Sequence, residues 1–199
     1  MLPMIARLLA LGAAVLVLIS LAQGWAPTRW MRTFWQRHGG YLRWYVASAP
    51  GTCIYVGILA VTTWVLLGMP EHAKELFLAA QSTNLEHLTR DPLRVLVRSA
   101  FFVSGTELLL WGALFLVFLA PAERWLGTGR AVVVFATGHI VATLLTAWGV
   151  YVRIRWFHGP ESLWNVQDTG ASYGFMALAG IMVYRLRGWN RAALLTVLP

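Results

Sequence analysis

Ser172 is the residue of this chain that is best placed to act as a nucleophile. It lies in the segment Gly170-Ala171-Ser172-Tyr173-Gly174, which follows a polar loop and opens an apolar stretch rich in small residues. A serine hydroxyl attacks a carbonyl group only when a base takes its proton. The competing interpretation is a packing serine that bonds to a backbone carbonyl where Gly174 and Gly180 let neighbouring helices approach. Both interpretations stay open.

Glu107 is the second candidate, because it is an ionisable side chain within a predicted membrane span. It lies eight residues into the apolar run 99–120, which is about 12 Å along a helix. Ionisable residues within a membrane commonly mark a pathway or a site. The alternative is a carboxyl group that is hydrogen-bonded inside the helix bundle.

His139 is expected to be a structural hydrogen-bonding residue, because its position in the run 131–152 places it too near the inner end to serve Ser172. The other side chains that chemistry could use are expected to be solvated or packed: His72, His87, His158 and Cys53. No pair of His, Cys, Asp or Glu has convincing metal-ligand spacing, so we expect no metal or other cofactor.

The composition excludes an ordinary soluble domain. Hydrophobic residues make up 58% of the 199 residues, charged residues make up 12%, and the mean hydropathy is +0.62. Soluble domains carry roughly 25% charged residues. The formal charge of +8 is not the mark of a nucleic-acid-binding protein, because the arginines lie at the ends of apolar runs and form no long basic cluster.

The apolar residues fall into long runs that predict an all-α, polytopic bundle of transmembrane helices. The predicted spans are 3–22, 48–69, 99–120, 131–152 and 170–184. The first is expected to be a retained helix, because no good cleavage site for a signal peptidase follows it. The long connection 70–98 contains an amphipathic piece, Glu71 to Ala80, and a turn at Arg90-Asp91-Pro92. Residues 192–199 look like the beginning of another apolar helix.

The charges predict a multi-pass protein of the plasma membrane with a defined orientation. The segments 28–44, 121–130 and 185–191 are rich in arginine, whereas 70–98 and 153–169 carry both signs of charge. Because positive loops stay inside, the first set is expected to be cytoplasmic and the second set extracytoplasmic.

Two motifs in this context resemble the rhomboid family of intramembrane serine proteases. Gly170-Ala171-Ser172 is similar to the start of the family's fourth core helix, and Glu123 with Gly127 resembles its Glu-x-x-x-Gly after the second core helix. The segments Ser82-Thr83-Asn84-Leu85 and Asp91-Pro92-Leu93 look like a divergent, actinobacterial branch. The resemblance covers roughly residues 41–191, so we divide the chain into an N-terminal helix with a basic segment, 1–40, and a rhomboid-like domain, 41–199.

The family pattern also implies roles that this chain fills differently. Rhomboid proteases take their catalytic histidine from a sixth core helix, which the resemblance would place after Pro199. Their oxyanion-binding positions on the second core helix correspond to Glu107 and Trp111 here, and a glutamate would repel an oxyanion. Tyr173 replaces the glycine that follows the serine. These residues, with Gly170 and Gly174, would line the pocket around Ser172.

Three more residues are predicted to have structural roles. Glu123 and Arg124 are expected to form a polar network at the inner surface, near Gly127. Asp168 is expected to cap the helix that begins near Gly170.

Three hypotheses about function follow from these features. The first is a rhomboid-like pseudoprotease, an integral membrane protein that contacts lipids and engages transmembrane segments of other proteins. The second is an active intramembrane serine endopeptidase that uses Ser172 with a histidine from outside this chain. The third, which Glu107 motivates, is a small transporter subunit. None involves nucleic acid.

Overall fold

A computed structural model confirms that the chain is all-α and rich in apolar helices. It describes residues 2–23, 29–103, 107–166, 168 and 171–197, and every regular element among them is a helix. The chain divides into two compact units, Met1–Ser48 and Ala49–Pro199. The predicted division after residue 40 falls inside a helix of the first unit.

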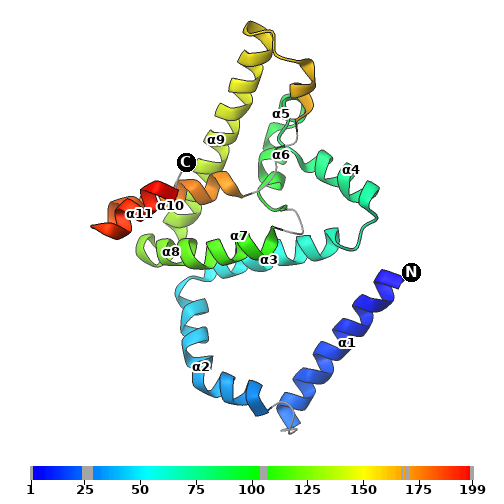
Figure 1. The fold of residues 1–199 in the computed structure, drawn as a ribbon, viewed down its shortest axis with the longest axis vertical. Coiled ribbons are helices and arrows are strands. Elements are labelled where there is room, and N and C mark those ends of the chain that lie inside the picture. Colours follow the sequence, from blue (N-terminus) through cyan, green and yellow to red (C-terminus); the bar gives the residue numbers. More distant parts are fainter. Residues whose placement is uncertain (1, 24–28, 104–106, 167, 169–170, 198–199) are drawn as a thin grey trace. The chain divides into compact units, whose positions relative to one another are not determined.

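The first unit consists of two helices (Figure 1), α1 (Leu2–Gln23) and α2 (Arg29–Ser48). α1 corresponds to the predicted span 3–22. The basic segment 28–44 lies almost wholly within α2, so its arginines are arranged along a helix.

The second unit contains all the remaining helices. Its long or apolar helices are α3 (Pro50–Leu66), α7 (Leu108–Leu114), the π-helical turn η2 (Phe115–Leu119), α8 (Ala120–Leu126), α9 (Thr128–Trp156), α10 (Ser172–Arg185) and α11 (Trp189–Val197). Figure 1 shows α3 running beside α7 and α8, and α10 packed across α9.

Two helices in the described part of the chain are long and apolar enough to cross a membrane. They are Leu108–Leu126 and Thr128–Trp156, and a third span results if Trp30–Ser48 and Pro50–Leu66 are counted together. Leu9–Ile19 is a shorter apolar helix.

The helix that was predicted over 99–120 lies further along the chain, at Leu108–Leu126. The predicted loop 121–130 is therefore helical up to Gly127, whose φ of 83° ends α8. Pro121 lacks an N–H group and would clash with the preceding turn of a regular α-helix. The wider turn η2 directly before it relieves this conflict, so the span continues through the proline.

The described part of the connection between α3 and α7 contains three helices: α4 (Glu71–Gln81), which corresponds to the predicted amphipathic piece, α5 (Leu85–Arg90) and α6 (Pro92–Ser99). The Asn84 side chain caps α5 by accepting the N–H of His87 at 2.8 Å. Asp91 separates α5 from α6 and accepts the N–H of Arg94 at 3.4 Å. A 3-10 turn, η3 (Glu161–Asn165), follows α9.

α9 and α10 pack closely because small residues face each other between them. A Cβ atom at Gly174 would lie 2.6 Å from the ring of Phe135, and a Cβ atom at Gly138 would overlap Ala177. The prediction of close approach is thus confirmed at Gly174. It is wrong at Gly180, where an added Cβ atom meets nothing within 4 Å.

Candidate functional site

The Glu123 carboxylate ties together the beginnings of two helices. Its Oε1 atom accepts the N–H of Gly51 at 2.8 Å and the hydroxyl of Thr128 at 2.7 Å. Its Oε2 atom accepts both the N–H and the hydroxyl of Thr52 at 2.7 Å. Glu123 is only 3% exposed. It thus satisfies N–H groups at the start of α3 that have no partner within the helix, and it places a negative charge at the positive end of the helix dipole.

A second polar cluster joins the connection 70–98 to the loop that follows α9. The Ser82 hydroxyl accepts the N–H of Asp168 at 2.7 Å. The carbonyl oxygen of Asp168 accepts the N–H of Thr83 at 2.9 Å and its hydroxyl at 2.8 Å. Ser82 and Thr83 are buried, so these bonds fix the backbone directly before α10.

The carboxylate of Asp168 does not cap α10, contrary to the prediction. It accepts the hydroxyl of Tyr173 at 3.1 Å, and no side-chain cap is found among the described residues at the start of α10. The physical reason is that Ser82 and Thr83 hold the Asp168 backbone, while Tyr173 holds its carboxylate. The Tyr173 hydroxyl also lies 3.2 Å from that of Thr146 on α9.

His139 is closer to the start of α10 than its sequence position suggested. Its ring centre lies 6.4 Å from that of Tyr173, the neighbour of Ser172. Its Nε2 atom lies 3.0 Å from the carbonyl oxygen of Leu96 and 3.2 Å from the Ser99 hydroxyl. Because a carbonyl oxygen only accepts, Nε2 carries a proton and cannot act as a base toward Ser99. The buried Nδ1 atom has no hydrogen-bond partner among the described residues.

Ser172 is the first residue of α10 and is half-buried. Its hydroxyl forms no hydrogen bond with any described residue. Asp168 and His139, which lie near this end of α10, are hydrogen-bonded to other groups. Gly170 falls outside the described residues.

Glu107 lies at the amino end of its span rather than in the middle of it. It is exposed and directly precedes α7, because the helix begins later than predicted. Its carboxylate accepts the indole N–H of Trp111 at 3.3 Å. The ring of Trp111 in turn packs edge-on against Phe175, with ring centres 5.8 Å apart. The structure therefore brings the first turns of α7 and α10 together through Trp111 and Phe175.

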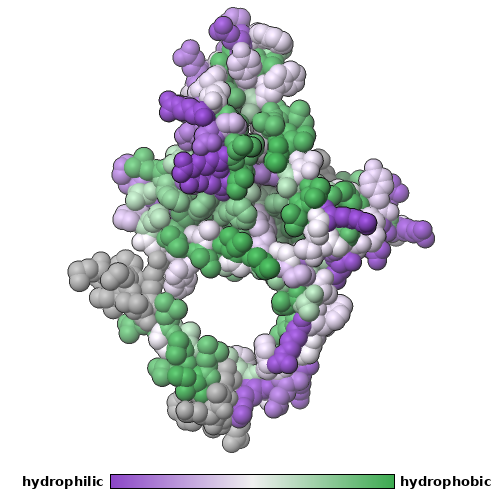
Figure 2. Space-filling model, turned by 180° about the vertical axis from the view of Figure 1, so that it is seen from behind, coloured by the Kyte–Doolittle hydropathy of each residue, from purple (hydrophilic) through white to green (hydrophobic). Residues whose placement is uncertain are grey.

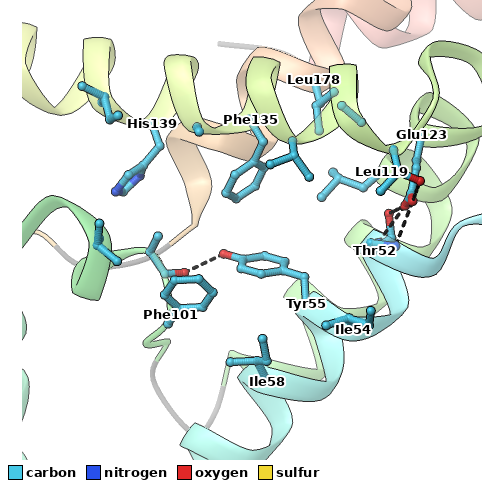
Figure 3. A pocket seen from close by; sticks show the side chains of 18 of the residues that line it. Thr52, Ile54, Tyr55, Ile58, Phe101, Leu119, Glu123, Phe135, His139 and Leu178 are labelled. Carbon is cyan, nitrogen blue, oxygen red and sulfur yellow. Dashed lines mark hydrogen bonds between the residues drawn. The ribbon is translucent and has the colours of Figure 1, made fainter.

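A cavity of about 430 Å³ lies between α3, α6 and α9. Figure 3 shows Tyr55 pointing into it from α3, with His139 at one end and the Glu123 network at the other. Tyr55 donates its hydroxyl to the carbonyl oxygen of Ala100 at 2.6 Å. The exposed residues around its opening are mostly apolar and include Ile54, Leu93, Val97, Val132 and Ile140, whereas Thr128 is polar.

Comparison with known proteins identifies the family to which the chain belongs. A family model described as rhomboid-like protein matches residues 44–199. The chain belongs to the rhomboid-like family. No curated protein and no solved structure matches it. The resemblance drawn from Ser172 and from Glu123 with Gly127 is thereby confirmed at the level of the family, while the actinobacterial branch stays a prediction.

Two features of this rhomboid-like protein were missed by reasoning from the sequence. The cavity was not predicted, because its lining comes from helices that are far apart in the chain. Thr52 and Thr128 were not singled out as partners of Glu123. A signal was present for both, since each threonine lies beside a predicted helix start, where orphan N–H groups attract a carboxylate.

Proposed function

We propose that this rhomboid-like membrane protein binds transmembrane segments of other proteins at the cavity between α3, α6 and α9, and that it does not cleave them. The observation that carries the proposal is the cavity itself. Its opening is predominantly apolar, as suits a site that faces lipid. Its volume of about 430 Å³ is close to that of one helical turn, roughly 400–600 Å³ from the diameter and pitch of a helix. It therefore suits side chains from one turn of a guest helix.

His139 gives this cavity a means of recognition. Its Nδ1 atom is a buried nitrogen without a partner among the described residues, and the residue lines the cavity. A guest helix that carries a serine or threonine could donate a hydroxyl proton to this nitrogen. Hydrogen bonds between helices in a membrane contribute about 0.6–2 kcal/mol.

The absence of cleavage is supported by the surroundings of Ser172. Nucleophilic attack needs a base within hydrogen-bond reach. His139 directs its protonated Nε2 atom to Leu96, and Asp168 bonds to Tyr173. Neither group is placed to accept the proton of Ser172.

The proposed setting is the plasma membrane, with segments 28–44, 121–130 and 185–191 in the cytoplasm. Two contacts support this assignment of the segments to the two sides of the membrane. Glu123 joins the segment 121–130 to the start of α3, and Ser82 joins the connection 70–98 to Asp168. The first contact joins a segment proposed to be cytoplasmic to the span that follows 28–44, and the second joins two segments proposed to lie on the outer side.

Photocrosslinking in proteoliposomes tests the binding site. The photoreactive residue p-benzoylphenylalanine replaces Val132, which lines the cavity, or Val133, which is 62% exposed beside it and does not. Two leucine-rich transmembrane peptides serve as probes, one with a central serine and one with alanine. We expect the serine peptide to crosslink roughly threefold better than the alanine peptide at position 132. We expect no such preference at position 133, and His139→Leu, whose side chain has no acceptor, should remove the preference at position 132.

Equal crosslinking of both peptides at both positions, or adducts formed only with lipid, would refute binding of transmembrane segments at this cavity. A serine-reactive fluorophosphonate probe tests the chemistry separately. Labelling that is lost in Ser172→Ala, together with cleavage of a peptide, would instead establish the protease hypothesis.

A further inference from the structure

Helix α2 carries positive charge that no carboxylate in its surroundings balances. It contains Arg32, Arg37 and Arg43, and no Asp or Glu precedes Glu71 in the chain. All three arginines are exposed, and none forms an ion pair with a described residue. Their natural partners are therefore anions from outside this unit, Met1–Ser48, which contains no Asp or Glu.

Two of these arginines lie on a different face of α2 from a row of aromatic residues. At 100° per residue, Arg32 and Arg43 lie within about 20° of each other on one face, with Gln36 beside them. The opposite face carries Trp30, Phe34, Tyr41 and Tyr45, and Arg37 lies at the edge of this face, about 20° from Trp30. In Figure 2 the region of α2, at the lower right, shows strongly hydrophilic residues, whereas the coloured part of α1 is hydrophobic.

The aromatic face is not buried by the rest of its unit. Trp30 is 70% exposed, Phe34 51% and Tyr41 59%. In water, such a row of large rings would be costly, whereas Trp and Tyr concentrate at the boundary between lipid and water. The residues of this face thus favour a lipid interface.

A cavity of about 700 Å³ lies between α1 and α2. It is lined by Leu18 of α1 and by Trp30, Met31, Arg32, Phe34, Trp35 and Gln36 of α2. The cavity combines aromatic and aliphatic walls with one guanidinium group. This combination suits a phospholipid, whose acyl chains are apolar and whose phosphate binds arginine.

We propose that α2 lies in the plane of the membrane interface and binds anionic phospholipids, with its aromatic face toward the acyl chains and with Arg32 and Arg43, on the opposite face, at the phosphates. A helix with a strong polar face, low overall hydrophobicity and Trp or Phe on the other face takes this position. A membrane-crossing α2 would instead bring Arg32, Arg37 and Arg43 into hydrocarbon, where charged side chains are strongly disfavoured. Residues 29–43 lie outside the family match, so this inference does not depend on the proposed function.

Spin-label accessibility in the full-length protein tests this proposal. Cys53, the single cysteine, is replaced by alanine, and a nitroxide is attached through Phe34→Cys or Gln36→Cys. Each protein is reconstituted into phosphatidylcholine vesicles, with or without an equal part of phosphatidylglycerol. With phosphatidylglycerol, we expect the label at position 34 to collide mainly with oxygen and the label at position 36 mainly with a water-soluble nickel complex. Without it, collisions of nickel with the label at position 34 should rise at least twofold.

Charge variants separate lipid binding from simple hydrophobic insertion. Arg32→Gln/Arg37→Gln/Arg43→Gln should remove the effect of phosphatidylglycerol, whereas Arg153→Gln/Arg155→Gln at the exposed end of α9 should preserve it. Oxygen-dominated collisions at both positions would show a membrane-crossing helix and overturn the proposal. Nickel-dominated collisions at both positions would also overturn the proposal. The same holds if the triple variant responds to phosphatidylglycerol as strongly as the protein without these three substitutions. Inorganic phosphate added to phosphatidylcholine vesicles should not reproduce the effect, and a full reproduction would refute lipid binding.

Discussion

The Nε2 atom of His139 lies 3.0 Å from the carbonyl oxygen of Leu96, and this contact joins α9 to α6. The same nitrogen is 3.2 Å from the hydroxyl of Ser99, so one ring proton faces two oxygen atoms. Both His139 and Ser99 are buried. The imidazole therefore acts as a fixed donor between two helices, and its Nδ1 atom is left without a partner among the described residues.

His139→Gln should retain most of the stability of the fold, whereas His139→Leu should lower it. A glutamine can place an amide nitrogen close to the position of Nε2, so the bond to Leu96 is kept. Leucine offers no donor, and the loss of a buried hydrogen bond costs about 1–3 kcal/mol. Thermal unfolding of the detergent-solubilised variants, followed by circular dichroism, measures the difference. Equal stability of the two variants would contradict the assigned role.

Glu123→Gln should destabilise the second unit more than any exposed acid-to-amide change. An amide offers one acceptor oxygen in place of two, so at least one of the donors from Thr52, Thr128 and Gly51 loses its partner. Hydrogen bonds to charged groups contribute about 1.5–3 kcal/mol each. Glu75→Gln, on the exposed face of α4, is the matched control and should unfold like the unmodified protein. A melting temperature for Glu123→Gln equal to that of the control would count against the network.

Gly138→Ala and Gly149→Ala should have opposite effects, although both glycines lie in α9. A Cβ atom at position 138 overlaps Ala177, and overpacking costs about 1–3 kcal/mol. At position 149 an added Cβ atom meets nothing, so alanine should stabilise the helix by about 0.5–1 kcal/mol. The double variant Gly138→Ala/Ala177→Gly moves the methyl group from one helix to the other. It should recover part of the loss in unfolding temperature, and a purely additive result would show that the two residues do not meet.

Ser82→Ala should loosen the backbone before α10 without unfolding the bundle. The N–H of Asp168 loses its acceptor, at a cost of about 1 kcal/mol, so exchange of this amide with deuterium should become about fivefold faster. Thr89→Ala removes only an exposed bond within α5, to the carbonyl oxygen of Glu86, and is the control. Hydrogen exchange followed by mass spectrometry measures the exchange rates in both variants. Unchanged exchange at Asp168 in Ser82→Ala would remove the basis for this contact.

The helices were predictable from the sequence because apolar runs, and the polar, glycine and proline residues that end them, determine secondary structure locally. Residues 170–184 predicted α10 to within two residues of its start, and Glu71 to Ala80 predicted α4. The start of the span at Leu108 was not predictable in the same way, since residues 99–103 are also apolar. Only tertiary packing distinguishes residues 99–103 from the span that begins at Leu108. Ser99 ends α6 against His139, and Val103 is buried in the core with Leu59 and Phe115.

The candidate site was less predictable, because hydrogen-bond partners are chosen in three dimensions. Asp168 precedes α10 in the manner of a cap, yet its carboxylate bonds to Tyr173 and its backbone to Ser82 and Thr83. The cavity wall likewise joins Tyr55 to His139 across a large separation in sequence. Local patterns hold no information on such choices.

The Glu123 network also has a consequence for the biosynthesis of the protein. The carboxylate that satisfies the first N–H groups of α3 is synthesised about seventy residues after them, and Thr128 comes later still. While the ribosome is still translating α7 and α8, the amino end of α3 must rely on water or lipid headgroups for hydrogen bonds. The contacts between Glu123 and the start of α3 therefore form only after Glu123 has been synthesised, so the order of translation sets when this end of the bundle can close.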